Sequence, residues 1–132
     1  MDLIEVGCAV VIKDKKLLIA QRKANDTYGG CWEFPGGKRE PDEAMEACLA
    51  REVREELGIE IRAREFFRQV DIEYSEKKIA LFFYFCDWVS GDPKCLDCQD
   101  VRWVSAEGLR GLQFPKGDDG ILAWLIQSGR IS

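Results

Sequence analysis

Three glutamates, Glu52, Glu55 and Glu56, lie close together in the sequence just before Gly58. On an α-helix, with about 100° per residue, their side chains fall within an arc of about 100°. The same geometry gathers a neighbouring apolar stripe that consists of Met45, Leu49, Val53 and Leu57. Glu56 points to the edge of this stripe, where a carboxylate is costly unless a cation compensates its charge. Clustered carboxylate oxygens suit Mg²⁺ or Mn²⁺, so the spacing indicates a divalent metal site.

The alternative is a solvated charged face, in which residues 51–56 form only local ion pairs. The residues around the glutamates distinguish the two interpretations. Their order is Gly37, five residues, Glu43, seven residues, Arg51-Glu52-Val53, one residue, Glu55-Glu56, one residue and Gly58-Ile59. This order resembles the signature of the Nudix hydrolases at every fixed position. We therefore favour a metal-dependent hydrolase over a solvated face.

The resemblance implies a role for each matched residue. The metal ligands would be the carboxylates of Glu52, Glu55 and Glu56 and the carbonyl of Gly36, and they would hold Mg²⁺ or, in its place, Mn²⁺. Glu43 and Arg51 are expected to orient the junction between the glycine-rich loop and the helix. The base that deprotonates the attacking water stays open between Glu55 and an acid in the segment 97–100. In one type of family member an acidic residue directly precedes the tryptophan of that region, where this chain has Arg102.

Segments outside the signature look like those of the MutT-type nucleoside triphosphate pyrophosphohydrolases, namely residues 18–22, 32–38, 99–104 and 112–115. Bacterial members of this subgroup cleave oxidised purine nucleotides such as 8-oxo-dGTP, or CTP and modified deoxycytidine triphosphates. The resemblance implies Mg²⁺-dependent conversion of such a triphosphate to the monophosphate and pyrophosphate. Metal ions would neutralise the phosphate oxygens and orient the attacking water.

Several residues are candidates for contacts with the substrate. Arg22 and Lys38 are expected to bind phosphates, although each also suits an exposed cation at a strand end or a turn. Asp118 is expected to read the base, because an ionised carboxylate only accepts hydrogen bonds and so favours the amino groups of cytosine or guanine over uracil and thymine. Three aromatic residues are candidates for the wall of the base pocket, with core packing as the alternative: Trp32, Phe34 and Phe114.

Two alternative functions remain beside this one. The first is a Nudix hydrolase of another diphosphate, such as ADP-ribose, a sugar nucleotide or a dinucleoside polyphosphate. A chain of 132 residues offers no obvious extra domain for a second large moiety, which disfavours it. The second is a non-catalytic nucleotide-sensing domain, in which the signature is usually eroded. The intact set of three glutamates argues against that alternative.

Composition narrows the class of protein further. A length of 132 residues predicts one domain spanning residues 1–132, and a net charge of −5 argues against a nucleic-acid partner. The chain has no histidine, which excludes histidine triads, histidine-bound zinc and a histidine base. No apolar stretch reaches about 18 residues and no basic segment precedes an apolar run, so we expect a cytoplasmic protein without membrane contact. The expected partner is a small nucleotide, and the chain is expected to be a monomer or homodimer.

The chain contains six cysteines: Cys8, Cys31, Cys48, Cys86, Cys95 and Cys98. Without an export signal they are expected to be free thiols rather than a disulfide framework. Cys95 and Cys98 form a CxxC pair, but a structural zinc would need two further ligands and no second close pair exists. Zinc binding and redox pairing stay open as alternatives, and incidental surface thiols are the favoured interpretation.

The remaining pattern predicts an α/β protein with the α/β/α sandwich of the Nudix fold, in which a mixed sheet lies between the box helix, which carries the signature, and a C-terminal helix. Strands are expected at residues 4–12, 17–21, 59–74, 78–89 and 101–104, with residues 75–77 as a hairpin turn. Residues 35–37 are expected to form a turn. The box helix is expected to run from Pro41, which suits a first helical turn, to Leu57. Ser105 is expected to cap a short helix at residues 106–109, and Asp118 or Asp119 to cap the last helix.

Overall fold

The N-terminal strand makes the pairings that join the sheet into one. The computed structural model describes residues 2–132. β1 (Asp2–Lys13) runs parallel to β6 (Lys77–Ser90) over most of its length and antiparallel to β4 (Gly36–Lys38) near its middle. At its end it turns back and pairs with β2 (Lys16–Gln21). β1 therefore connects two halves of the sheet that would otherwise be separate.

The outer strands complete a mixed sheet with the order β3-β2-β1-β6-β5. β5 (Glu60–Glu73) and β6 form the predicted antiparallel hairpin, while β3 (Trp32–Glu33) and β7 (Asp100–Val104) each pair with β2. The predicted strands lie within two residues of these limits. The hydrophobic pattern therefore places the strands correctly.

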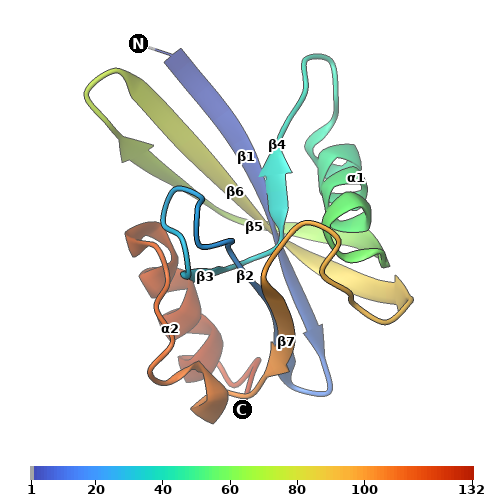
Figure 1. Cartoon of the computed structure of the whole chain (residues 1–132). Coiled ribbons are helices and arrows are strands. Elements are labelled where there is room, and N and C mark those ends of the chain that lie inside the picture. The colour runs from blue at the N-terminus through green and yellow to red at the C-terminus, as the bar shows by residue number, and fades with distance from the viewer. Residues whose placement is uncertain (1) are drawn as a thin grey trace.

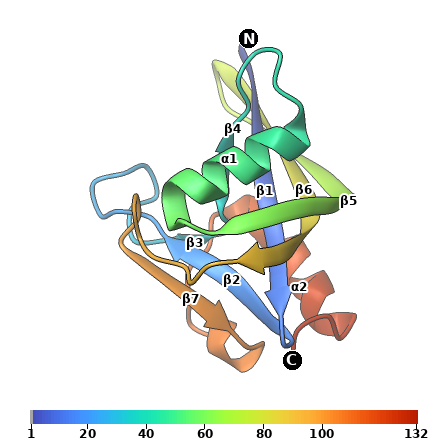
Figure 2. The ribbon, with the colours of Figure 1, turned by 90° about the vertical axis from the view of Figure 1, so that its right-hand side faces the viewer.

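Alternating side chains of β1 enter two separate cores. Val11 packs in the core that includes the buried face of α1 (Met45–Leu57), and Val10 packs in the core that includes α2 (Asp119–Gln127). Figure 2 shows α1 in front of the sheet and α2 behind it, and Figure 1 shows the two helices on opposite sides. The predicted α/β/α sandwich is confirmed. No helix within residues 2–132 is long and apolar enough to cross a membrane.

The box helix α1 begins at Met45, so the predicted start at Pro41 is wrong. Asp42 takes a left-handed conformation with φ 64°, and Ala44 is extended with ψ 146°, which no helix interior allows. Hydrogen bonds within the loop replace the missing helical turn, because the Glu40 N–H donates to the Glu43 carboxylate at 3.0 Å. The predicted C-terminal end is confirmed, since Gly58 is left-handed and caps the helix with φ 69°.

The glycine pair predicted as a turn forms strand β4 instead. Gly36 and Gly37 pair with Cys8 and Gly7 of β1. Gly36 has φ 153°, and a side chain there would overlap the carbonyl of Gly7. Glycine at this position therefore lets β4 approach β1 closely, and this close approach holds the N-terminal side of the box helix against the sheet.

The segment between β7 and α2 contains two short 3₁₀ helices, Glu107–Leu109 and Lys116–Asp118. Ser105 accepts a hydrogen bond from the Gly108 N–H at 3.0 Å, so its predicted capping contact is present. Asp118 occupies the N-cap position of α2, but among residues 2–132 its side chain makes no capping hydrogen bond. The predicted position of the cap is therefore confirmed, but the Asp118 carboxylate is buried in the pocket described next and does not bond to the helix end.

Candidate active site

A pocket of about 580 Å³ opens between β1, β4, α1, the β5–β6 hairpin and the loops that precede β7 and α2. Its charged lining residues are Arg22, Asp26, Glu33, Lys38, Glu52, Glu56, Asp97 and Asp118. Its apolar lining includes Val6, Cys8, Phe34, Ile72, Ile79 and Leu81. Carboxylates outnumber cations in this lining, so the field inside the pocket favours a bound cation over an anion alone.

Glu56 carries a strongly perturbed carboxylate at the end of α1. Burial raises its pKa to about 8, with further rises from Glu33 and Glu52, and a hydrogen bond from the Gly36 backbone opposes them. The apolar stripe next to it is buried as predicted: Met45, Leu49, Val53 and Leu57. A divalent cation beside Glu56 would compensate this buried charge, so the residue fits the metal site that its sequence position predicts.

Glu52 lies against the backbone of β4. Its side chain is only 19% exposed, and burial raises its pKa while Arg51 lowers it. A side chain at Gly37 would overlap the Glu52 carboxylate. Glycine at position 37 therefore makes room for this carboxylate at the wall of the pocket.

Glu55 lies outside this group. Its side chain is 60% exposed and pairs with Arg51 at 3.4 Å, and it does not line the pocket. Within residues 2–132 no three acidic or thiol side chains converge closely enough to hold a metal. Mg²⁺ commonly uses one or two carboxylates and takes its other ligands from water and substrate phosphates. Glu52 and Glu56 fit that mode of binding.

Arg51 fixes the loop before α1 to the helix. Its Nε and Nη2 donate to both oxygens of Glu43 at 2.7 and 3.0 Å, and its Nη1 donates to Glu52 at 2.9 Å. Nη2 also donates to the carbonyl of Lys38 at 3.1 Å. Hydrogen bonds from Arg51 lower the pKa of Glu43 to about 2. Arg51 and Glu43 thus lie where they can orient Glu52, as the sequence predicts for the loop–helix junction.

Arg22 and Lys38 both line the pocket, and Arg22 is paired with a carboxylate that the sequence analysis did not select. Arg22 Nη1 donates to Glu33 at 2.6 Å. Burial raises the pKa of Glu33, and Arg22 opposes that rise. The available signal was a charged residue between two buried aromatic residues, Trp32 and Phe34.

Only one of the three aromatic candidates lies on the pocket. Phe34 lines it and packs edge-on against Phe83 with ring centroids 5.2 Å apart. Trp32 and Phe114 pack in the core on the α2 side, which was the alternative for both.

Asp118 lies in the pocket and is 6% exposed. Burial raises its pKa to about 7, with Glu33 and Asp119 adding to the rise. The sequence predicts an ionised acceptor at Asp118, and burial opposes that ionised form. The protonated form can donate a hydrogen bond as well as accept one.

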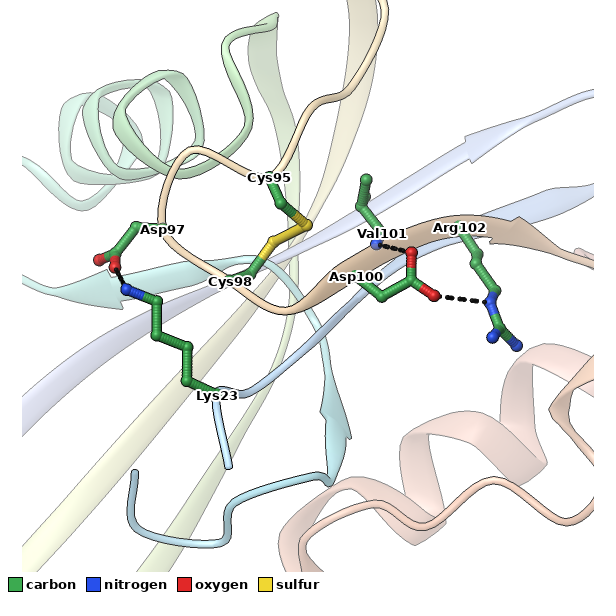
Figure 3. Close-up of a disulfide and its surroundings, with 7 residues drawn as sticks. All are labelled: Lys23, Cys95, Asp97, Cys98, Asp100, Val101 and Arg102. Carbon is green, nitrogen blue, oxygen red and sulfur yellow. Dashed lines mark hydrogen bonds and ion pairs between the residues drawn. A yellow bond between two sulfur atoms is a disulfide. The ribbon is translucent and has the colours of Figure 1, made fainter. Parts of the chain in front are cut away.

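Cys95 and Cys98 form a disulfide, so the expectation of incidental free thiols is wrong for this pair (Figure 3). Asp97, between them, lines the pocket and pairs with Lys23 at 2.8 Å. Asp100 instead accepts hydrogen bonds from the Val101 N–H at 2.8 Å and from Arg102 at 3.2 Å. Of the two acids in this segment, Asp97 is therefore the one at the pocket.

Comparison with known proteins agrees with this geometry. The chain matches the family model of the NUDIX domain over residues 7–124. It is 40% identical over 115 residues to a CTP pyrophosphohydrolase of Escherichia coli (strain K12), covering 87% of this chain and 84% of that protein. It is 28% identical over 126 residues to an 8-oxo-dGTP diphosphatase of the same strain, covering 95% of this chain and 98% of that protein.

A crystal structure of a MutT protein from Methanosarcina mazei Go1 superposes on the chain with a TM-score of 0.83. The two are 30% identical, and the match covers 96% of this chain and 95% of that one. The sandwich with an acidic helix beside a glycine-rich strand defines a Nudix hydrolase. The chain belongs to the Nudix family, and its relatives are CTP pyrophosphohydrolases and MutT-type enzymes. Nudix hydrolases generally need a divalent metal ion.

Proposed function

We propose that this protein is a Mg²⁺-dependent nucleoside triphosphate pyrophosphohydrolase that releases the monophosphate and pyrophosphate. The observation that carries the proposal is that one pocket contains all the groups such a reaction needs. Two largely buried carboxylates, Glu52 and Glu56, lie in its wall. The same pocket contains the buried acid Asp118 and the cations Arg22 and Lys38. Such a pocket offers ligands for a metal, for phosphates and for a polar base edge. Relatives that act on CTP and on 8-oxo-dGTP support this assignment.

The residues divide the work by charge. Glu52 and Glu56 would hold the metal. The Gly36 carbonyl and Glu55 would join them as ligands when the substrate is bound. A bound Mg²⁺ supplies neutralisation of the phosphate oxygens. Arg22 and Lys38 orient the phosphates, while Glu43 and Arg51 hold α1 in place. Asp97 or Glu55 takes the proton from the attacking water.

We propose that CTP, a modified cytidine nucleotide or 8-oxo-dGTP is the substrate. Phe34 offers an aromatic surface, and Asp118 offers either an ionised acceptor or a protonated donor and acceptor. Cytosine and guanine carry an exocyclic amino group that a carboxylate can bind, whereas uracil and thymine do not. Such a nucleotide-pool enzyme would act in the cytoplasm as a monomer or homodimer.

A screen of nucleotides with Mg²⁺ tests the reaction, with products identified by phosphorus NMR. CTP, 5-substituted deoxycytidine triphosphates and 8-oxo-dGTP should yield pyrophosphate, and excess EDTA should stop the reaction. ADP-ribose, sugar nucleotides and dinucleoside polyphosphates are included as competing substrates. Release of orthophosphate, preference for one of these competitors, or full turnover in EDTA would contradict the assignment. Binding without turnover of any compound would indicate a sensor domain.

A further inference from the structure

The segment between β6 and β7 contains the disulfide, and its backbone hydrogen-bonds to the C-terminal end of the box helix α1. The N–H groups of Leu96 and Asp97 donate to the carbonyl of Glu56 at 2.8 and 3.3 Å. The N–H of Lys94 donates to the carbonyl of Leu57 at 2.9 Å. Two of these three donors lie between the paired cysteines, so the disulfide-bonded turn contacts the backbone of a proposed metal ligand directly.

The same turn also reaches the other wall of the pocket. Asp97 pairs with Lys23, which follows β2, and the Gln99 N–H donates to the carbonyl of Gln21 at 2.9 Å. Both Asp97 and Cys98 line the pocket. Figure 3 shows Asp97 directed toward Lys23 and Asp100 directed away from it toward Arg102. The turn thus connects the end of α1 with the end of β2 and fixes Asp97 between them.

This disulfide is poorly suited to stabilising the whole fold. It encloses only two residues, and the entropy that a disulfide removes from the unfolded chain is smallest for the shortest loops. Both cysteines are partly exposed. Exposed disulfides are those that thiols reduce most readily. These features favour a local and reversible role.

The other cysteines are less suited to exchange. Cys8, Cys48 and Cys86 are buried, and burial raises the pKa of each thiol, to about 11 for Cys48 and about 12 for Cys86. The thiolate is the reactive form, so these groups react slowly. Cys31 is only partly buried and lies outside the pocket lining, which makes it a suitable control.

We propose that the Cys95–Cys98 disulfide is a redox switch that sets turnover by positioning Asp97 at the pocket. In reduction, a thiolate of a small thiol attacks one sulfur and the S–S bond breaks. A second thiol then resolves the mixed disulfide, so that two thiols are oxidised to one disulfide and two protons pass to Cys95 and Cys98. The reduced turn loses its constraint, Asp97 leaves the pocket wall, and turnover falls. This inference rests on the proposed function of the pocket.

Hydrogen exchange tests the structural step without any substrate. Oxidised and dithiothreitol-reduced protein are compared by mass spectrometry over residues 91–100. We expect the amides of Lys94, Leu96 and Asp97 to exchange at least about tenfold faster after reduction, because they lose their carbonyl partners. Equal exchange in the two forms overturns the proposal, whatever the enzyme's activity. This readout therefore stays decisive if the proposed function itself fails.

Kinetics test the functional step with the nucleotide that the screen identifies. We expect reduction to lower kcat at least about tenfold with a smaller change in KM, since displacement of a group proposed to take the proton from the attacking water affects the chemical step most. The double variant Cys95→Ser/Cys98→Ser should have the kcat of the reduced enzyme, and added thiols should not change it. The kcat of Cys31→Ser should fall on reduction as it does in the wild type. In Asp97→Asn the two redox forms should have equal kcat.

Two kinetic outcomes overturn the proposal: equal kcat in both wild-type forms, or a redox effect that persists in Asp97→Asn. Equal kcat together with a shifted thermal midpoint would identify a structural disulfide only. The wild-type comparison needs no substitution, so it remains valid if the double variant does not fold. Failure of both redox forms to hydrolyse any nucleotide contradicts the proposed function. Hydrogen exchange alone then tests whether reduction releases the turn.

Discussion

Three glutamates on one helix have three different surroundings, and this difference bears on their chemistry. Glu56 is buried beside Glu33 and Glu52, Glu52 is wedged against Gly37, and Glu55 is exposed on the side of Arg51. A carboxylate with few water contacts gains most from a bound cation. We therefore expect Glu56 and Glu52 to be the stronger metal ligands and Glu55 to act nearer the solvent.

We expect the substitutions Glu52→Gln, Glu55→Gln and Glu56→Gln each to lower kcat at least ~100-fold, on the order of 3 kcal/mol, with the fold intact. Each variant keeps the side-chain shape but loses a charge that we propose binds the metal or activates the attacking water. Steady-state kinetics with circular dichroism checks this. Glu46→Gln on the exposed first turn of the same helix is the control and should keep wild-type kcat. A folded Glu55→Gln enzyme with normal kcat would leave Glu55 as a partner of Arg51 only.

The raised pKa of Asp118 leads to a prediction of how the stability of the protein depends on pH. Its pKa is about 7 in the folded protein, against an ordinary value of 3.8. A carboxyl whose folded pKa is raised contributes stability at low pH and loses it as pH rises through the folded pKa. Between pH 5 and pH 8 the metal-free wild type should therefore lose on the order of 2–3 kcal/mol more stability than Asp118→Asn. Urea titrations of both proteins at these pH values measure it, and parallel curves would contradict it.

The same residue predicts the choice of base. Asp118→Ala removes the buried pocket acid that the sequence analysis selected to read the base, so the preference for CTP over UTP should fall by roughly 1.5–3 kcal/mol. The ratio of kcat/KM for the two nucleotides measures this preference. Asp119→Ala is the matched control, since Asp119 lies outside the pocket lining. An unchanged ratio in Asp118→Ala would show that another group reads the base.

At the scale of elements, the contact between β4 and α1 sets the position of Glu52. We expect Gly37→Ala to lower kcat at least about tenfold, because the new methyl group would overlap the Glu52 carboxylate and move it. Gly37 does not have a positive φ, so backbone strain should contribute little. Gly120→Ala in α2 is the control, with no neighbour closer than 4.0 Å to the added methyl group. Kinetics and thermal melting of both variants measure the effect on kcat separately from the effect on stability.

The elements that were predicted correctly are those with a regular hydrophobic period. Strand limits and the end of α1 at Gly58 follow from local residue types. The start of α1 was misplaced because Pro41 suits a helix, whereas the left-handed Asp42 and the ion pair between Glu43 and Arg51 impose a loop. β4 was missed because a glycine pair lacks the side chains that mark a strand, and its pairing with β1 is a long-range contact.

At the scale of the whole molecule, the pocket brings together six acids from five separate segments: Asp26, Glu33, Glu52 with Glu56, Asp97, and Asp118. The signature identifies only the pair on α1, and relation to a family suggests Asp97 and Asp118. Glu33 and the apolar wall at Ile72 and Leu81 could not be predicted, because pairing between strands places them there. β3 pairs with β2, and the β5–β6 hairpin pairs with β1 through β6. Sequence spacing reveals neighbours along a helix but not across a sheet.

This convergence of acids predicts that metal binding stabilises the fold. A ligand that binds only the folded state adds about 2.7 kcal/mol at 100 times its Kd, so saturating Mg²⁺ should raise the Tm by roughly 5–10 °C at pH 8. Removing one repelling carboxylate should act in the same direction without metal. Glu56→Gln is therefore expected to melt higher than the metal-free wild type and to gain little from Mg²⁺, while Glu46→Gln should gain as much as the wild type. Melting curves with and without MgCl₂ at constant ionic strength measure both effects. A wild-type Tm that ignores Mg²⁺, or an equal gain in Glu56→Gln, would show that Glu56 is not a metal ligand in the absence of substrate.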